Sequence, residues 1–364
     1  MKYDAVIVGA GLFGATVARC LLDAGRRVLV LEKRPVIGGN CHDSLHDGVM
    51  VNWYGGHIFH TSNQGIWDFA TRFAPFRQIS HRVKAAANNT IYSFPINLMT
   101  LQQLWGVTTR GEAERLIEER RYKWMQPQGD IETYVLHHYG PEIYETFVYG
   151  YTLKQWGRDP MHLPASIIKR IPVRLTWDDR YFSDTWEGVP IHGYTDWVTS
   201  MLGTADIRLN VDYLENQEHY DSLGTVTVYS GPVDALFNYR YGKLEYRSLA
   251  FHYETGESLG CATLNQTSPA PAYTRQVDFA FLRHDPAPAR SVVMTEYPTG
   301  VGDPMYPIRD DHNVAIYEMY RTRLRGVERR LVVGGRLGSY QYYNMDQVIG
   351  MGLKTGSEVL RGLG

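Results

Sequence analysis

Two short apolar runs near the start of the chain enclose a glycine-rich turn and a stretch with helical periodicity. Residues 5–8 read Ala-Val-Ile-Val, residues 28–31 read Val-Leu-Val-Leu, and residues 9–14 read Gly-Ala-Gly-Leu-Phe-Gly. Between the turn and Gly25, apolar residues recur at helical spacing, whereas a short apolar run bounded by glycine is typical of a buried strand. The pattern therefore predicts strand, turn, helix and strand, the unit from which parallel α/β sheets are built.

Further along the chain, helical periodicity gives way to a series of short β-type runs. Helices are expected at residues 66–73 and 97–151 and from about Met345 onward. Short strands are expected at residues 82–87, 90–93, 207–209, 211–213, 225–229, 249–253, 262–265, 291–296 and 331–333. The first two of these strands should form a hairpin through Asn88-Asn89. The long helical stretch is a candidate second domain.

Composition and charge narrow the range of partners. The chain has 364 residues, which suggests two or three domains, and 44% of them are hydrophobic, which is enough for sizeable cores. A formal net charge of −2 gives no overall field that would attract nucleic acid or an anionic membrane. No apolar run approaches the ~18 residues needed to span a membrane. We therefore expect no nucleic-acid partner and no membrane association, and any anion site must be local.

The cysteines and the first residues indicate a cytoplasmic protein. Cys20, Cys41 and Cys261 are scattered without metal-ligand spacing, as expected for a reduced cytosolic protein without disulfides. Lys2-Tyr3-Asp4 leads directly into the first predicted strand, so no signal peptide is expected. The 26 tyrosines and 8 tryptophans suit a large, partly wet cleft, because these side chains have an apolar body and a polar tip.

The glycine turn carries the first candidate chemistry. Gly9 permits a tight turn, Gly11 lets the backbone approach a pyrophosphate, and Gly14 lets the helix pack against the strand. The helix N-terminus offers free amides to the phosphates, and Glu32, after the second strand, can accept hydrogen bonds from a ribose diol. The alternative is a glycine turn without a ligand. The context of strand, helix and acid favours a bound dinucleotide.

A second glycine pair bears on which dinucleotide is expected. Gly38-Gly39-Asn40 follows the acid by a few residues and resembles the FAD-binding proteins in which a second glycine pair passes close to the pyrophosphate. Simple NAD dehydrogenases usually lack that pair. FAD is therefore favoured over NAD.

Two histidines follow a third glycine pair, Gly55-Gly56, which implies close approach of the backbone to another group. His57 and His60 have no acidic residue or third histidine nearby in the sequence, so we expect no metal site. Two interpretations stay open. The pair are either hydrogen-bonded turn histidines or histidines beside a flavin ring.

Five motifs occur in the same order as in one known family. They are Gly-His-Ile-Phe-His-Thr at 56–61, Tyr-Thr-x-Lys-Gln-Trp-Gly at 151–157, Arg-Ile-Pro-Val-Arg at 170–174, Tyr-Thr-Arg at 273–275, and Gly-Gly-Arg-Leu at 334–337 followed by Tyr342-Tyr343. Each motif alone is unspecific, but together they span a chain that resembles bacterial UDP-galactopyranose mutase. The resemblance implies an α/β fold in which an FAD-binding Rossmann-like domain carries a helical insertion domain and an antiparallel β-sheet domain.

The resemblance also implies where these domains lie. The FAD-binding domain would be discontinuous and would comprise residues 1–80, 190–240 and 315–364. The helical domain would cover residues 95–160, with a mobile loop after it. The antiparallel sheet domain would comprise residues 81–94, 161–189 and 241–314.

The implied reaction is a non-redox ring contraction that interconverts UDP-galactopyranose and UDP-galactofuranose and requires reduced FAD. In the family mechanism the flavin N5 attacks the anomeric carbon and UDP leaves. The covalent flavin–sugar adduct opens and recloses as a five-membered ring, and UDP returns. The resemblance implies a homodimer as well.

Paired arginines suit this chemistry, because the departing diphosphate develops negative charge. By motif position these are Arg170 and Arg275, and His60 beside the flavin is the third predicted catalytic residue. Arg170 stands in a Lys-Arg-Ile-Pro segment that we expect to form a loop. Either arginine could instead be a solvated surface charge, but neither belongs to an evident charged helix face.

The other predicted site residues are carried over by motif position. Substrate contacts are expected from Phe147, Tyr151, Thr152, Trp156, Tyr181, Arg247, Asn265, Tyr306, Tyr342 and Asn344. Cofactor contacts are expected from Gly9, Gly11, Phe13, Gly14, Glu32, Lys33, Gly39, Asn40, His57, Ile58, Val211, Arg336, Tyr343 and Met345. A tyrosine hydroxyl can donate to phosphate without adding charge, although most of the tyrosines must belong to the core.

Three positions depart from the family pattern and leave the sugar open. Gly56 stands in place of a proline, His81 in place of an asparagine, and Asn344 in place of an aspartate. The alternatives are a mutase of the same type acting on UDP-N-acetylgalactosamine or a dTDP-6-deoxysugar, and an amine-oxidase-like flavin oxidoreductase. The arginine and tyrosine set favours a mutase, because an oxidase of small apolar amines has no use for it. Nothing in the sequence supports a binding module without catalysis.

Overall fold

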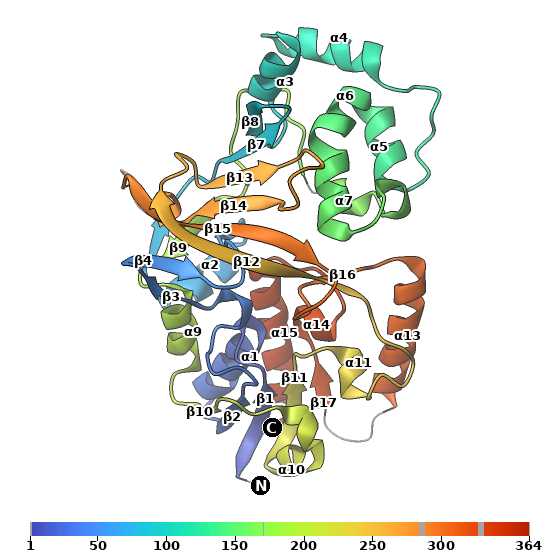
Figure 1. Ribbon diagram of the computed structural model, residues 1–364. Helices are drawn as coiled ribbons and strands as arrows, with labels where there is room; N and C mark the ends of the chain where they lie inside the picture. Colours follow the sequence, from blue (N-terminus) through green and yellow to red (C-terminus); the bar gives the residue numbers. More distant parts are fainter. Residues whose placement is uncertain (1, 170, 284–287, 327–330, 364) are drawn as a thin grey trace.

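The structure, a computed structural model, describes residues 2–169, 171–283, 288–326 and 331–363 (Figure 1). The lower half of the described chain in Figure 1 is built on a parallel sheet. Its strands follow the order β10 (Asp206–Arg208), β2 (Val28–Leu31), β1 (Tyr3–Val8), β11 (Gly224–Tyr229) and β17 (Leu331–Val333). In the central strand β1, Val6 lies opposite Leu29 on one side and Thr227 on the other. Strands from the beginning, middle and end of the chain thus form one sheet, and the predicted Rossmann-like βαβ unit is present.

Helices α1 (Leu12–Asp23), α9 (Tyr194–Leu202) and α15 (Met345–Leu363) share one apolar core with this sheet. Glycines let α15 pack closely against α1. A Cβ added at Gly352 would lie 2.6 Å from the Cβ of Thr16, and one added at Gly356 would lie 2.6 Å from the Cβ of Cys20. The C-terminal helix is therefore fixed against the N-terminal unit, and the Sδ of its first residue, Met345, lies 3.6 Å from Cys41 Sγ.

A second sheet of the described chain crosses the middle of the molecule in Figure 1. Its strands follow the order β16 (Tyr306–Pro307), β12 (Tyr246–Glu257), β15 (Arg290–Thr299), β14 (Arg275–Asp278), β13 (Thr263–Gln266), β7 (Val83–Ala87) and β8 (Thr90–Phe94). Neighbouring strands are antiparallel, except that β13 and β7 are parallel. The predicted hairpin joins β7 to β8 through Asn88 and Asn89, whose positive φ values of 49° and 60° suit a two-residue turn.

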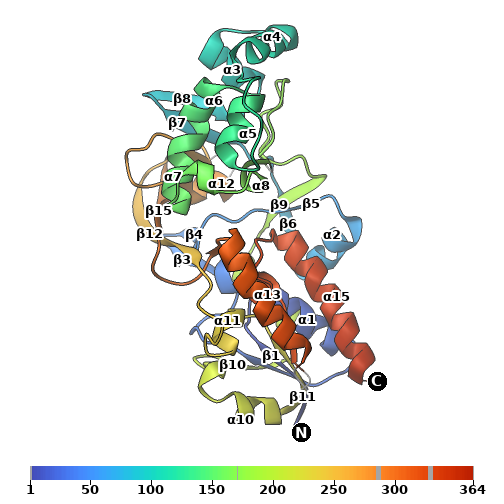
Figure 2. The ribbon, with the colours of Figure 1, turned by 90° about the vertical axis from the view of Figure 1, so that its right-hand side faces the viewer.

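The predicted helical insertion forms the top of the molecule, where Figures 1 and 2 both separate it from the parallel sheet. It comprises α3 (Leu98–Trp105), α4 (Arg110–Arg120), α5 (Ile131–His138), α6 (Pro141–Ile143), the π-helical segment η2 (Tyr144–Tyr149) and α7 (Gly150–Trp156). Asn97 and Thr109 cap α3 and α4 with reciprocal capping boxes. Within α4 only Ala113 is buried, so this helix is solvated, as its charge pattern predicts.

Smaller elements connect these parts. A three-stranded sheet joins β5 (Phe59–Thr61), β9 (Trp186–Pro190) and β6 (Phe76–Gln78), and β3 (Asp43–His46) pairs with β4 (Val49–Asn52). The remaining short helices are α2 (Gln64–Thr71), α8 (Ser166–Lys169), α10 (Gln217–Ser222), α11 (Val233–Leu236), α12 (Phe279–Arg283), α14 (Gly335–Gly338), and the turns η1 (Gly39–Cys41), η3 (Pro160–His162) and η4 (Tyr213–Glu215). The longer α13 (Asp311–Arg325) lies beside the parallel sheet in Figure 1. Among the described residues no helix combines the length and apolarity that crossing a bilayer requires.

One local prediction was wrong. Residues 211–213 do not form a strand, because Asn210 enters the left-handed region (φ 56°) and Asp212 then caps the short η4 turn by accepting a hydrogen bond from the Leu214 amide at 3.0 Å. In the Lys-Arg-Ile-Pro segment expected to form a loop, Ile171 and Pro172 lie outside any helix or strand, while Lys169 is the last residue of α8. Arg170 itself lies outside the described residues. The domain limits stay a prediction, although β9 pairs with β5 and β6 and not with the large sheet.

Candidate active site

The glycine segments form a cradle of backbone at the carboxyl ends of β1 and β2, where open α/β sheets bind their ligands. Gly9 has a φ of +104°, and a Cβ added at Gly14 would overlap the carbonyl oxygen of Gly9. A Cβ added at Gly39 would lie 2.9 Å from the Cα of Gly11, so the two glycine segments approach each other directly. Helix α1 carries no side-chain cap, which leaves its first amides available to a ligand.

Glu32 closes one side of this cradle. Its Oε2 accepts a hydrogen bond from the Ala10 amide at 2.8 Å and its Oε1 accepts one from the Arg34 amide at 2.9 Å, so the buried carboxylate is oriented by backbone. The Val211 amide donates to the Glu32 carbonyl at 3.0 Å. Lys33, by contrast, points away from the cradle, because its largely exposed side chain pairs with Asp212 at 3.1 Å.

A second group of predicted cofactor residues surrounds the start of α15. Phe13 packs against Gly334, where an added Cβ would overlap its ring. Arg336 donates to the Tyr343 carbonyl at 2.8 Å, and its guanidinium lies 4.6 Å from the centroid of the Tyr342 ring. Asn40 accepts a hydrogen bond from Arg34 at 3.1 Å. Because α15 begins at Met345, the first amides of this helix also lack an intrahelical partner.

A cleft of about 390 Å³ opens between this region, the large sheet and α7. Most of the predicted site residues line it: His57, Ile58, His60, Tyr151, Thr152, Trp156, Tyr181, Asn265, Arg275, Tyr306, Arg336, Tyr342, Asn344 and Met345. These residues come from many separate segments of the chain. The fold therefore brings cofactor candidates and substrate candidates into one cavity.

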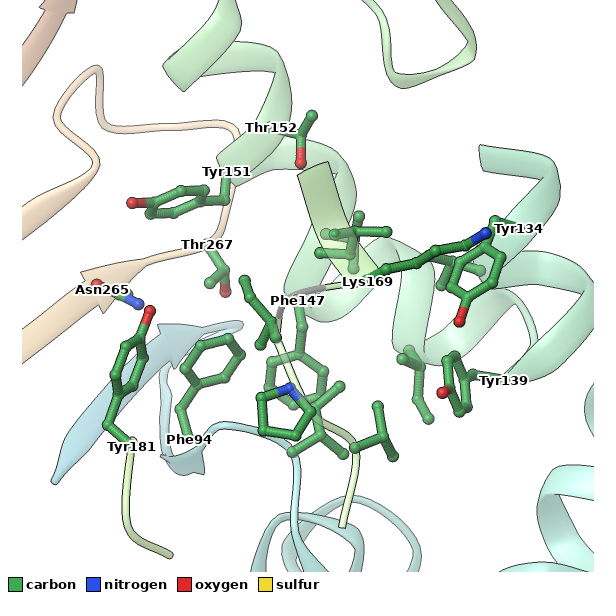
Figure 3. Close-up of a pocket in the computed structure, with 18 of the residues that line it drawn as sticks. Phe94, Tyr134, Tyr139, Phe147, Tyr151, Thr152, Lys169, Tyr181, Asn265 and Thr267 are labelled. Atoms are coloured by element: carbon green, nitrogen blue, oxygen red, sulfur yellow. The ribbon is translucent and has the colours of Figure 1, made fainter. Parts of the chain in front are cut away.

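A smaller pocket of about 160 Å³ adjoins the cleft and shares Tyr151, Tyr181 and Arg275 with it. Figure 3 shows Tyr181, Asn265 and Tyr151 at one side of this pocket and Tyr134, Tyr139 and Lys169 at the other, with Phe94 and Phe147 between them. Apolar side chains form most of its wall. Phe147, one of the predicted substrate contacts, lines this aromatic pocket and not the cleft.

Arg275 is held in the cleft wall by two hydrogen bonds. Its Nε donates to Asn265 Oδ1 at 3.2 Å and its Nη2 donates to the Tyr151 hydroxyl oxygen at 3.0 Å. The strand register explains the arrangement, because Asn265, Arg275 and Glu296 are directly opposite one another on β13, β14 and β15. The guanidinium is thus oriented before any ligand arrives.

Glu296 is a site residue that the sequence analysis missed. Its carboxylate is buried in the cleft wall, 3.9 Å from Arg275 Nη1. Burial raises the pKa of Glu296, while Arg275 and the Gly56 amide lower it. An isolated glutamate inside a strand pattern gives no signal of this role, since only the register of β14 and β15 reveals its partner.

The histidines differ in their surroundings. His60 stacks on Phe182, with ring centroids 3.7 Å apart, and its Nδ1 lies 2.8 Å from Asp184 Oδ2. Burial lowers the pKa of His57 to about 4 and that of His81 to about 3, so both are neutral at pH 7. His57 Nε2 and His81 Nδ1 are buried without a hydrogen-bond partner. All three histidines line the cleft, and among the described residues no cluster of potential ligands is arranged to hold a metal ion.

The remaining predicted contacts divide into two groups. The rings of Tyr306 and Tyr342 stack with centroids 5.7 Å apart, and Asn344 also lines the cleft, where its backbone N–H donates to Gln347 Oε1 at 2.9 Å. Arg247 lies behind α7, outside the lining of the cleft and of the aromatic pocket. Its Nε donates to the Gln155 carbonyl at 2.9 Å and its Nη2 to the Lys154 carbonyl at 3.2 Å.

The fold and the cradle define a Rossmann-type dinucleotide-binding protein with a polar cleft beside the dinucleotide segment. A family model described as NAD(P)-binding Rossmann-like domain matches residues 7–73, and one described as UDP-galactopyranose mutase matches residues 146–342. A probable UDP-galactopyranose mutase of Klebsiella pneumoniae is 38% identical over 98% of this chain and 94% of its own length. The chain therefore belongs to the UDP-galactopyranose mutase family, and it is an isomerase of the mutase type.

Other relatives bear on fold and substrate. A dTDP-fucopyranose mutase of Escherichia coli is 33% identical over 94% of this chain and 95% of its own length. A crystal structure of reduced UDP-galactopyranose mutase superposes with a TM-score of 0.77 and 15% identity, covering 100% of this chain and 96% of that one. Wild-type putrescine oxidase bound to putrescine superposes with a TM-score of 0.59 and 14% identity, covering 99% of both chains. Both structures, at such identities, show a shared fold alone.

Proposed function

We propose that this chain is an FAD-dependent mutase that interconverts UDP-galactopyranose and UDP-galactofuranose without net oxidation or reduction. The observation that carries the proposal is the shared cleft. Arg275, held by Tyr151 and Asn265, lines the same cavity as Ile58, Arg336 and Met345 on the cofactor side. A cation prepared for an anionic ligand thus faces the region where a redox cofactor would react.

The residues present fit FAD. A Cβ added at Gly39 would crowd the Gly11 backbone, so the two glycine segments present bare backbone that a pyrophosphate can approach, and Glu32 is oriented to accept from a ribose. The buried, unpartnered Nε2 of His57 fits a polar neighbour at the inner end of the cradle. When bound, a reduced flavin supplies a nucleophilic nitrogen beside the sugar.

The protein contributes orientation and charge. Arg275 stabilises the diphosphate as it takes up negative charge on leaving the sugar, and the hydroxyls of Tyr181, Tyr306 and Tyr342 donate to it without adding charge. Glu296 holds Arg275 from the sheet side. The aromatic pocket beside Tyr151 suits the planar base of the nucleotide, with Phe147 at its wall. By analogy of motif, we propose Arg170, which lies outside the described residues, as a second cation for the diphosphate.

A second candidate is the same reaction on another sugar nucleotide. The similarity to a dTDP-fucopyranose mutase favours it, as do His81 and Asn344, both of which line the cleft. An amine-oxidase-like reaction is supported by fold similarity alone, and the arrangement of Arg275 with three tyrosines gives an amine substrate no matching partner. A cytoplasmic homodimer remains part of the proposal.

Incubation of dithionite-reduced protein with UDP-galactofuranose tests the proposal, with product separated by chromatography. We expect UDP-galactopyranose to form. UDP-N-acetylgalactosamine and a dTDP-6-deoxysugar are run in parallel, and a much faster reaction with either would shift the substrate to the second candidate. No isomerisation of any of the three by flavin-loaded, reduced protein would refute the mutase.

A further inference from the structure

Lys154 makes an unusual set of contacts from helix α7. Its Nζ donates to three backbone carbonyl oxygens, those of Gln266 at 3.0 Å, Pro271 at 3.1 Å and Tyr273 at 2.8 Å. An ammonium group has three N–H donors, so all of them are used. Gln266 is the last residue of β13, and Pro271 and Tyr273 belong to the connection that leads from β13 to Arg275 at the start of β14.

This ammonium has no carboxylate partner among the described residues. Burial lowers the pKa of Lys154 to about 8, and no neighbouring charge contributes to the shift. A cation partly withdrawn from water is costly unless its donors are satisfied, and here only main-chain carbonyls satisfy them. The contact therefore helps to fix the path of a connection whose two ends are also held by strands, since the Thr267 amide donates to the Ala86 carbonyl at 3.0 Å and the Thr274 amide donates to the Glu296 carbonyl at 3.0 Å.

Two further contacts join α7 to the same connection. A Cβ added at Gly150 would lie 2.6 Å from the Pro269 nitrogen, and the Thr274 hydroxyl donates to Gln155 Oε1 at 3.4 Å. Gly150 and Lys154 are four residues apart and so lie on one face of the helix. Arg247 holds the end of α7 from the other direction through the carbonyls of Lys154 and Gln155.

These contacts join the two walls of the cleft. One wall is α7, which carries Tyr151, and the other is the sheet, which carries Asn265 and Arg275. We propose that Lys154 is a positioning residue. It fixes the position of Arg275 relative to Tyr151 and so prepares the diphosphate site. The proposal rests on the proposed function, because Arg275 is taken to bind the diphosphate.

The test is a double-mutant cycle read by UDP affinity. Lys154→Met keeps the length of the side chain and removes its donors, and it is made both in the wild type and in Arg275→Ala. Titration calorimetry gives the Kd for UDP of each FAD-loaded protein, and kcat is measured on UDP-galactofuranose. Lys354→Met, an exposed lysine on α15, is the matched control.

We expect Lys154→Met to weaken UDP binding roughly tenfold in the wild type, the loss of about one hydrogen bond to a charged group, and by less than twofold in Arg275→Ala. The FAD content should stay normal, and Lys354→Met should bind UDP as the wild type does. If Lys154→Met does not accumulate as folded protein, Lys154→Gln, which keeps two donors without the charge, takes its place in the cycle.

Equal losses of affinity in the two backgrounds, or no loss in the wild type, would overturn the positioning role while the mutase function stands. A wild type that binds no UDP and isomerises no UDP-sugar would overturn the proposed function, and the positioning role with it.

Discussion

The glycine cradle and the polar cleft beside it are built in opposite ways. The cradle is made of backbone and lies within a short stretch of sequence, where Gly9, Gly14 and Gly39 are required by close approach or by positive φ. The cleft is made of side chains from distant segments, and Arg275 gains its partners only through the register of three strands. A site made of backbone can thus be predicted from a local sequence pattern, whereas a site made of side chains depends on how distant segments fold together.

A substitution in the cradle should have the largest effect on cofactor binding, because a single added methyl group would fill the space. In Gly14→Ala the new Cβ overlaps the Gly9 carbonyl oxygen. We expect loss of bound FAD and a free energy of unfolding lower by about 3 kcal/mol, the upper range for overpacking. Flavin absorbance after purification and urea unfolding measure the two effects.

Gly111→Ala is the control, because a Cβ added at this glycine of α4 would have no neighbouring atom within 4 Å. It should keep normal flavin content and stability. A Gly14→Ala protein that carries one FAD per chain would contradict the account of the cradle.

Substitutions in the cleft should have the opposite effect: the protein should lose turnover and keep its bound FAD. Arg275→Ala should lower kcat about a hundredfold, or about 3 kcal/mol, by analogy with the loss of one oxyanion donor. Arg275→Lys should recover only part of the rate, because an ammonium cannot replace the bidentate fork. The same loss is predicted for Arg170→Ala. Turnover is measured at matched flavin occupancy.

Arg321→Ala, which removes an exposed arginine paired with Glu318 on α13, is the control and should turn over normally. Near-normal turnover of Arg275→Ala would mean that this arginine does not hold the diphosphate. Loss of FAD from Arg275→Ala would contradict the division of roles, because a cleft residue would then also be needed for cofactor binding.

The environment of His81 in the cleft can be tested by the pH dependence of the free energy of unfolding. Its pKa is about 3 in the folded protein and about 6.5 when unfolded, so between these values the unfolded chain binds the extra proton. Stability contributed by the neutral ring is therefore lost as pH falls from about 6.5 toward 3. His81→Asn should remove up to about 1.4 kcal/mol per pH unit from the slope of unfolding free energy against pH in this window.

Urea unfolding of both FAD-saturated proteins at pH 7.5, 6 and 5 measures this difference. The two curves should run parallel above pH 7 and diverge below it. Parallel curves at all three pH values would mean that His81 is protonated as readily in the folded chain as in the unfolded one.

The smallest effect is expected at Asn344. Asn344→Asp adds a negative charge to the cleft wall beside Tyr342 and Arg336, close to the proposed anionic ligand. We expect the relative rates with UDP-galactose, UDP-N-acetylgalactosamine and a dTDP-6-deoxysugar to shift by a few-fold, since a partly exposed charge interacts over short range only. Identical relative rates in the wild type and Asn344→Asp would mean that Asn344 does not determine substrate specificity.

The sequence predicted the cradle well, because its glycines and Glu32 are demanded by local geometry. It predicted much of the cleft only through the order of family motifs. Glu296 and Lys154 were missed as site-forming residues, since one acts through a strand register and the other through carbonyls of a distant connection. Arg247 matches a family position, yet in the fold it contacts the carbonyls at the end of α7.

The central claim is that a flavin in the cradle serves a non-redox reaction in the cleft. The most direct test compares the number of product molecules formed with the number of flavins oxidised. The protein is reduced once, excess dithionite is removed, and turnover is followed under anaerobic conditions. We predict many molecules of UDP-galactopyranose formed from UDP-galactofuranose per flavin, with the flavin spectrum still that of the reduced form at the end. Oxidation of one flavin for each product molecule, or a reaction that stops after one turnover, would contradict the account.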